Sequence, residues 1–237
     1  MNVEEYLNQL NESQREAVVY NEGPSLVVAG AGSGKTRVLT YKIAYLLQLG
    51  LPPYSILALT FTNKAAGELK ERLTAMLGDT GGDVWAATFH STCARILRRD
   101  GDRIGYSSHF TVYDTDDSKR LVKDCQKALN IDDKMISHKS ILSEISHAKD
   151  SMLSPADYQA AAGSDFRLAK IGAVYELYQK RLREADAMDF DDLLGNTVEL
   201  FRQCPDVLEY YQNRFRYIMV DEYQDTNQVQ YEFVRLL

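Results

Sequence analysis

The stretch that most constrains this chain is a glycine-rich loop between an apolar run, Ser25 to Ala29, and an amphipathic segment, residues 37–47. The loop reads Ala29-Gly30-Ala31-Gly32-Ser33-Gly34-Lys35-Thr36. A buried strand, a tight loop and a helix in this order predict a phosphate-binding loop. The three glycines permit positive φ angles and let backbone N–H groups approach phosphate oxygens closely.

Two polar residues of this loop carry the chemistry. Lys35 is placed to reach the β- and γ-phosphates of a nucleotide, and the Thr36 hydroxyl to ligate the accompanying Mg²⁺. The first position of G-x-x-x-x-G-K-[ST] is here Ala29, so the pattern is met in its relaxed form. A glycine-rich turn with a chance Lys-Thr is the alternative, and the flanking strand and helix patterns favour the nucleotide site.

Composition places the chain among soluble globular proteins. Its 237 residues are 45% hydrophobic and 26% charged, enough for one large domain or two modest ones. No apolar run is long enough to span a membrane, and the N-terminus lacks an export signal. The three cysteines lack C-x-x-C spacing, which predicts reduced thiols in a cytoplasmic protein. The net charge of −7 restricts any nucleic-acid site to a local groove.

Apolar runs alternate with helical patterns over the first hundred residues. Ile56 to Thr60 and Val84 to Thr88 read as strands, and each is followed by a helix. This rhythm predicts an α/β fold with a parallel sheet. The polar residues 60–64 and 88–91 then lie at the sheet edge that carries ligands in such folds. From about residue 114 to 188 only helical periodicity follows, after a short β-like run at 110–113, which suggests a separate helical insert.

A second half of a nucleotide site follows the insert. Tyr217 to Asp221 is an apolar strand that ends in two carboxylates, Asp221 and Glu222. The aspartate suits Mg²⁺, and the glutamate suits deprotonation of an attacking water. The chain stops at Leu237 within an amphipathic helix, which favours an N-terminal piece of a longer protein.

With both halves in place, the chain resembles the N-terminal portion of superfamily I DNA helicases of the UvrD, Rep and PcrA group. The resemblance begins at about Leu10. The similar blocks are the Q motif around Gln14, AGAGSGKT as motif I, TFTNKAAGEL as motif Ia, TFHS at 88–91 as motif Ib, MDFDDLL at 188–194, and VDEYQDTN at 220–227 as motif II.

The resemblance implies roles for individual residues. It implies ATP as ligand, with Gln14 reading the adenine edge and Arg37 joining the phosphate contacts of residues 29–36. Asp221 would bind Mg²⁺ together with Thr36, Glu222 would act as base, and Gln224 would link the nucleotide to the rest of the motor. Single-stranded DNA would be contacted by Phe61, Thr62, Asn63, Lys64 and His90.

The resemblance also implies an architecture. Residues 1–108 and 188–237 would form a RecA-like P-loop NTPase domain, incomplete at its C-terminus, and 109–187 an inserted all-helical accessory domain against which duplex DNA rests. The implied activity is 3′–5′ translocation on single-stranded DNA and at junctions with duplex. Motifs III to VI, and the second RecA-like domain that delivers arginines to the γ-phosphate, have no counterpart before Leu237.

Two other functions fit parts of the pattern. One is an ATP-binding switch that does no work on DNA, although such a switch has no need of the residue stretches 61–64 and 88–91. The other is the motor of a helicase–nuclease of the RecB or AddA type, which differs in the sequence beyond Leu237. Repair, plasmid replication and clearing of stalled transcription are all compatible with the motifs, each with its own partner proteins.

Overall fold

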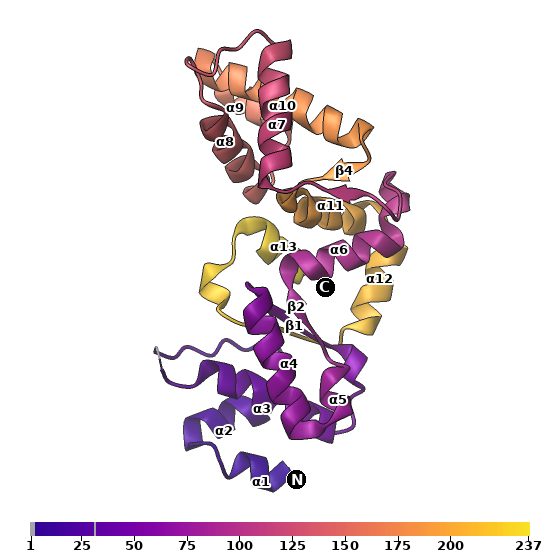
Figure 1. Cartoon of the computed structure of the whole chain (residues 1–237). Helices are drawn as coiled ribbons and strands as arrows, with labels where there is room; N and C mark the ends of the chain where they lie inside the picture. Colours follow the sequence, from indigo (N-terminus) through magenta and orange to yellow (C-terminus); the bar gives the residue numbers. More distant parts are fainter. Residues whose placement is uncertain (1–2, 31) are drawn as a thin grey trace. The chain divides into compact units, whose positions relative to one another are not determined.

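The computed structural model describes residues 3–30 and 32–237, which form two compact units. The first unit comprises residues 1–89 and 210–224, and the second comprises 90–209 and 225–237. Figure 1 labels the helices and most of the strands. Ala31, one of the predicted phosphate-loop residues, lies outside the described residues.

The first unit is built on a parallel three-stranded sheet of order β2-β1-β5. Its strands are β1 (Ile56–Thr60), β2 (Trp85–Thr88) and β5 (Tyr217–Val220). In the register, Ala58 of β1 faces Ala86 of β2 on one side and Met219 of β5 on the other. The predicted parallel pairing is therefore confirmed for these three strands, and Asp221 directly follows the end of β5 at Val220.

Helices bury the central strand of this sheet. All five residues of β1 are buried, and its apolar side chains pack with α3 (Lys35–Gln48) and α4 (Asn63–Leu77) around Ile43, Leu69 and Leu73. Helix α4 begins where the Thr62 hydroxyl accepts a hydrogen bond from the Ala65 N–H, and it ends at Gly78. A helix with one apolar stripe and a capped start is what residues 62–78 predict.

The predicted strand at Ser25 to Ala29 is wrong for this structure. Residues 24–30 have no regular structure, and Leu26 and Val28 are 70% and 87% exposed. Among the described residues, the only strands of the sheet are β2, β1 and β5, so this segment has no strand partner. A strand needs a neighbour for its backbone hydrogen bonds, and apolar composition cannot supply one.

Short elements complete the first unit. Helices α1 (Val3–Leu7) and α2 (Glu12–Val19) pack on α3 through a small core of Leu7, Val18 and Val38. The Asn11 side chain caps α2, and Gln14 returns the bond to the Asn11 N–H, as the Asn-x-x-Gln spacing predicts. A 3-10 turn at Pro53–Ser55, helix α5 (Asp79–Gly82) and a 3-10 turn at Tyr223–Asp225 fill the connections.

The second unit is helical. Its elements are α6 (Phe89–Asp100), a 3-10 turn at Gly101–Ile104, α7 (Thr115–Ala128), α8 (His138–Asp150), α9 (Pro155–Ala162), α10 (Phe166–Glu184), α11 (Phe190–Gln203), α12 (Pro205–Arg214) and α13 (Gln228–Leu236). Phe89 of α6 and residues 210–214 of α12 belong to the first unit. Residues between 122 and 187 share one buried cluster that includes Ile141, Ile171 and Tyr178. No described helix combines the length and apolarity that a membrane span requires.

A two-stranded ladder closes this helical region. Strand β3 (Thr111–Val112) matches the predicted β-like run, and it pairs in parallel with β4 (Ala187–Met188). The pairing brings together the two ends of the segment 113–186. Two residues are too few for a periodic pattern, so the sequence indicated β3 but not its partner.

Candidate nucleotide and DNA sites

The phosphate loop has the backbone that its glycines predict. Gly32 and Gly34 have φ angles of 75° and 88°, the left-handed region that suits glycine. The Ser33 N–H and hydroxyl both donate to the Gly30 carbonyl, at 3.3 and 2.6 Å. A Cβ on Gly34 would lie 2.8 Å from Gln14 Nε2, so a side chain there would be both strained and crowded.

Lys35 and its neighbours start helix α3 directly behind the loop. The Lys35 ammonium donates to the Ala29 carbonyl at 3.2 Å, so the charge lies across the loop. Thr36 occupies the next helical position, and Arg37 donates to the Gln9 carbonyl at 2.8 Å. A helix N-terminus and a lysine aimed over a glycine loop together favour the binding of an anion.

Gln14 connects helix α2 to the phosphate loop. Its Nε2 donates to the Ser33 carbonyl at 3.0 Å, while its Oε1 accepts the Asn11 N–H at 3.2 Å. Gln14 therefore lies beside the phosphate loop, and its contact with an adenine base stays a prediction. Both polar atoms of its amide are used by the protein here.

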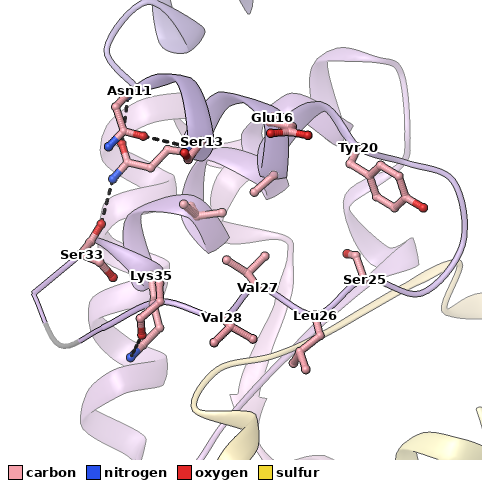
Figure 2. A pocket seen from close by; sticks show the side chains of 14 residues that line it. Asn11, Ser13, Glu16, Tyr20, Ser25, Leu26, Val27, Val28, Ser33 and Lys35 are labelled. Atoms are coloured by element: carbon pink, nitrogen blue, oxygen red, sulfur yellow. Dashed lines mark hydrogen bonds between the residues drawn. The ribbon is translucent and has the colours of Figure 1, made fainter.

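A pocket of about 400 Å³ lies between α2, the segment 25–29 and the start of α3. Figure 2 shows Lys35 and Ser33 toward one end of this pocket and Tyr20 and Ser25 toward the other. Val27 and Val28 contribute an apolar wall. The volume is within the usual range of small-molecule sites, and the combination of apolar wall and cationic end suits a base linked to phosphates.

Asp221 and Glu222 extend directly from β5. The Asp221 N–H continues the sheet by donating to the Leu59 carbonyl at 3.0 Å. Burial and the neighbouring Glu222 charge raise the pKa of Asp221, although the charges of Lys35 and Arg72 and a hydrogen bond from the Glu222 N–H pull it down. Lys35 and Asp221 both belong to the first unit, so the two predicted halves of the nucleotide site lie in the same unit.

Glu222 is held in an unusual conformation. Its φ of 52° is in the left-handed region, which non-glycine residues seldom adopt and which often marks functional sites. The Gln224 amide donates to Glu222 Oε2 at 2.5 Å, so the predicted base is oriented by the glutamine two residues further on. Gln224 belongs to the 3-10 turn Tyr223–Asp225, which follows Glu222 directly.

The oxygen ligands at this end of the sheet suit Mg²⁺. Asp221 offers a half-buried carboxylate and Thr36 a hydroxyl, both hard donors of the kind Mg²⁺ prefers. Within residues 3–30 and 32–237, no cluster of three or more His, Cys, Asp or Glu side chains could hold a metal.

The predicted DNA contacts of motif Ia lie at the carboxyl end of β1 in the first unit. Phe61 is half-buried, with its ring centroid 5.5 Å from that of Phe89. Thr62 caps α4, while Asn63 and Lys64 are exposed in its first turn. The Lys64 side chain is 87% exposed, and its ammonium lies 3.9 Å from a Glu68 carboxylate oxygen. An exposed ion pair of this length is weak, so the Lys64 charge remains available to a phosphate.

The remaining predicted contact, His90, belongs to the second unit. Its ring lies edge-on to that of Phe190, with centroids 6.0 Å apart and planes at 78°. Burial lowers the pKa of His90, which Asp191 partly offsets. Phe190 is 50% exposed and was not singled out from the sequence, although it lies within the MDFDDLL block. Its apolar type at the first position of a helix was the only available signal.

Comparisons with known proteins agree with this geometry. Residues 10–237 match the family model described as the UvrD/REP helicase N-terminal domain. The chain is 52% identical over 232 residues to an ATP-dependent DNA helicase PcrA of Staphylococcus aureus strain Mu50, and 50% identical to that of Staphylococcus epidermidis strain RP62A. Each match covers 98% of this chain and 32% of the relative, so the chain spans about a third of their length.

Proposed function

Because the chain belongs to the UvrD/REP helicase N-terminal domain family, we propose that it is the ATP-binding part of an ATP-dependent DNA helicase that translocates 3′ to 5′ on single-stranded DNA. The observation that carries the proposal is that one unit holds both a phosphate loop with the Lys35 ammonium bonded across it and, directly after β5, the Asp221–Glu222 carboxylate pair. A phosphate loop and a strand-end carboxylate pair are the two halves that ATP hydrolysis requires.

Each residue of the site has a proposed role. Lys35 and the loop N–H groups neutralise and orient the β- and γ-phosphates of ATP. Thr36 and Asp221 would hold Mg²⁺, which supplies further charge neutralisation when bound. Glu222 accepts a proton from the attacking water, and its contact with Gln224 orients the carboxylate for that task.

DNA binding is proposed for two sets of residues. Phe61 offers a ring on which a base can stack, and Thr62, Asn63 and Lys64 offer polar contacts to the backbone. His90 and Phe190 offer a second aromatic pair, of which Phe190 is half exposed. Stacking on aromatic rings is tolerant of sequence, as a translocating motor requires.

The RecA-like architecture is part of this proposal. We propose that residues 109–187 act as the helical accessory domain and that a second RecA-like domain completes the cleft in the longer protein. The exposed Leu26 and Val28 fit a RecA-like domain whose sheet is incomplete in this chain, because an unpaired apolar segment gains from a further strand that covers it. Free, buried cysteines and a DNA substrate favour a cytoplasmic enzyme.

Nucleotide selectivity tests the proposal. We expect the protein to prefer Mg-ATP to Mg-GTP, because the Gln14 amide matches the donor and acceptor of the adenine edge. Isothermal titration calorimetry with both nucleotides measures this, with Gln14→Ala as the variant and Gln9→Ala as a control on a nearby exposed glutamine. Equal affinities in the unmodified protein, or an unchanged preference in Gln14→Ala, would remove Gln14 from the base site.

A further inference from the structure

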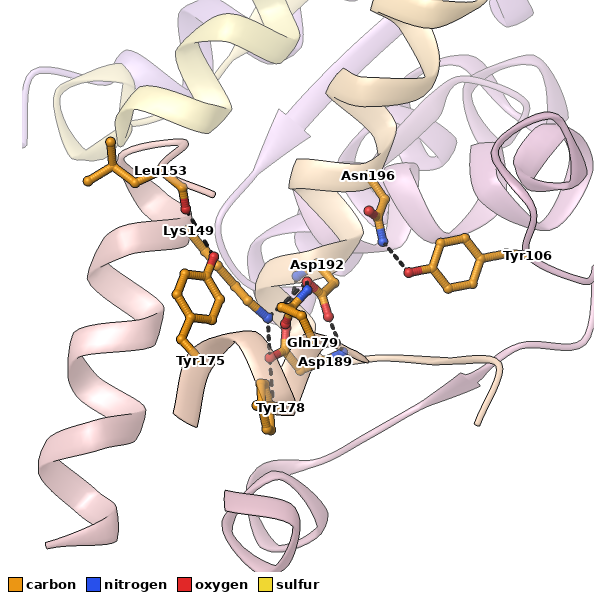
Figure 3. A network of polar contacts seen from close by, with 9 residues as sticks. All are labelled: Tyr106, Lys149, Leu153, Tyr175, Tyr178, Gln179, Asp189, Asp192 and Asn196. Atoms are coloured by element: carbon orange, nitrogen blue, oxygen red, sulfur yellow. Dashed lines mark hydrogen bonds and ion pairs between the residues drawn. The ribbon is translucent and has the colours of Figure 1, made fainter. Parts of the chain in front are cut away.

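The second unit contains a buried group of three charges, here called the ion triad: Lys149, Asp189 and Asp192. Lys149 Nζ lies 2.6 Å from Asp189 Oδ2 and 2.8 Å from Asp192 Oδ1. The three side chains are only 6%, 11% and 6% exposed. Figure 3 shows the lysine reaching from α8 to the carboxylates at the start of α11.

Further hydrogen bonds tie the ion triad to α10. The Tyr178 hydroxyl donates to Asp189 Oδ2 at 2.8 Å, and the Gln179 amide donates to Asp192 Oδ1 at 3.0 Å. Asp189 and Asp192 also form the capping box of α11, each accepting the backbone N–H of the other at 2.9 and 3.1 Å. The first turn of α11 is therefore fixed by two other helices.

Stability alone does not account for such an arrangement. Apolar side chains of similar volume often stabilise a core as well as a buried ion pair does, because the desolvation of the charges offsets their attraction. The ion triad moreover carries two negative charges and one positive charge. The ion triad does fix the position of the backbone between Asp189 and Asp192.

The residue at that position is Phe190. It follows Asp189 as the first residue of α11, with half of its side chain exposed and its ring edge-on to His90. A large aromatic side chain on the surface gains little from folding, but it is suited to stack against a ligand. The side chains of both neighbours in sequence have protein partners. Asp189 accepts a hydrogen bond from Lys149, and Asp191 is hydrogen-bonded to Ser146.

We propose that the ion triad positions Phe190 against His90 for contact with single-stranded DNA, with Lys149 as the positioning residue. This inference rests on the proposed function, since it assumes that the His90–Phe190 pair contacts DNA. Lys149 itself touches no DNA in this account. It acts through α11, by keeping the first turn of the helix in one place.

The test uses the full-length protein and fluorescence anisotropy with labelled oligo-dT. We expect Phe190→Ala and Lys149→Met each to weaken DNA binding by about 5- to 150-fold, the loss expected for one base stack. The double variant should bind DNA as tightly as the single variant with the lower affinity, because both substitutions remove the same contact. Glu232→Gln, which breaks a different charge cluster of the second unit, is the matched control and should bind as the unmodified protein does.

Steady-state ATPase assays separate positioning from general damage. In Lys149→Met the DNA concentration for half-maximal stimulation should rise by the same factor as the Kd, while kcat at saturating DNA and the KM for ATP stay unchanged. If circular dichroism shows that Lys149→Met has lost helix, the same binding and ATPase measurements are made on Tyr178→Phe and Asp189→Asn, with the same expected results. Asparagine still caps a helix, so Asp189→Asn changes the ion triad without removing the cap.

The outcomes distinguish this inference from the proposed function. If neither Phe190→Ala nor His90→Ala weakens DNA binding, the proposed DNA contact in the second unit is wrong, and the positioning role falls with it. If Phe190→Ala weakens binding but Lys149→Met does not, the contact stands and the positioning role is overturned. Losses that multiply in the double variant would also overturn it, as would a raised KM for ATP.

Discussion

The phosphate loop of the first unit and the ion triad of the second unit show two ways of holding functional side chains. The loop is exposed on an irregular segment, with Val28 at 87% exposure and the Lys35 ammonium resting on a backbone carbonyl. The ion triad is enclosed, and each of its charges has a charged or hydrogen-bonding partner within the same unit. The ion triad finds all its partners within this chain, whereas we expect the phosphate loop to need further protein.

That difference has a physical meaning. Lys35, Asp221 and Glu222 have affinity for phosphate and Mg²⁺, but they are only partly buried, so water competes for their contacts. Asp189 and Asp192 are screened from water, so Lys149 exerts a strong effect on them. Burial lowers the pKa of Lys149, but the two carboxylates more than offset this and raise it. We therefore expect the nucleotide site to depend on further protein and the ion triad to be self-sufficient.

The largest expected effect concerns ATP hydrolysis by this chain alone. An arginine delivered across a domain interface contributes about 10³–10⁵ in rate to phosphoryl transfer. We predict that residues 1–237 hydrolyse ATP at least about a thousandfold more slowly than the longer protein, with little stimulation by DNA. Steady-state ATPase assays with and without single-stranded DNA measure this, with Lys35→Ala as the blank. Full turnover by the chain alone would show that its nucleotide site is already complete.

Next in size is the loss of Lys149 from the ion triad. Lys149→Met leaves two buried carboxylates without a cation, and we predict a loss of about 3–5 kcal/mol in the free energy of unfolding at pH 8. Urea denaturation measures the loss. Lys127→Met, at an exposed pair 4.0 Å from Asp124, should change the free energy by less than about 0.5 kcal/mol.

The same variant has a predicted pH dependence. Burial already raises the pKa of Asp192 to about 6, and Lys149 is the main group that opposes this rise. Without the lysine, both carboxyl pKa values increase above their unfolded values, so stability is greatest at low pH and is lost as pH rises through the folded values. Lys149→Met should therefore lose less stability at pH 5 than at pH 8. An equal loss at both pH values would mean that the carboxylates have found other partners.

A smaller effect is expected at Phe61 of the first unit. Phe61→Ala should weaken single-stranded DNA binding by about 1–3 kcal/mol with little dependence on sequence, the size of one base stack. Fluorescence anisotropy on oligo-dT and mixed strands measures it in the full-length protein. Tyr54→Ala is the matched control, since Tyr54 is 58% exposed and precedes β1, at the opposite end of the strand from Phe61. Unchanged affinity in Phe61→Ala would restrict its ring to packing with Phe89.

The smallest effect tests the exposed segment directly. Val28→Ser in residues 1–237 should change the free energy of unfolding by less than about 0.5 kcal/mol, because the side chain is exposed. In the longer protein the same change should cost about 1–3 kcal/mol if another strand covers Val28. Equal small effects in both proteins would mean that residues 25–29 stay uncovered.

Local patterns in the sequence were enough to determine much of this protein. The caps at Asn11, Thr62 and Asp189, and the apolar runs of β1, β2 and β5, fix where helices and strands begin. These signals act over a few residues, so spacing along the chain encodes them fully. The phosphate loop and the Asp221–Glu222 pair are recognisable for the same reason, because their chemistry requires contiguous residues.

Only the tertiary structure decided which segments meet. It paired β3 with β4, placed Phe190 beside His90, and brought Lys149 to Asp189, 40 residues further along the chain. It also left Ser25 to Ala29 unpaired, although their composition is that of a strand. Apolar character specifies that a segment gains from burial, but the partner that buries it is set by contacts distant in sequence, and no local spacing records them.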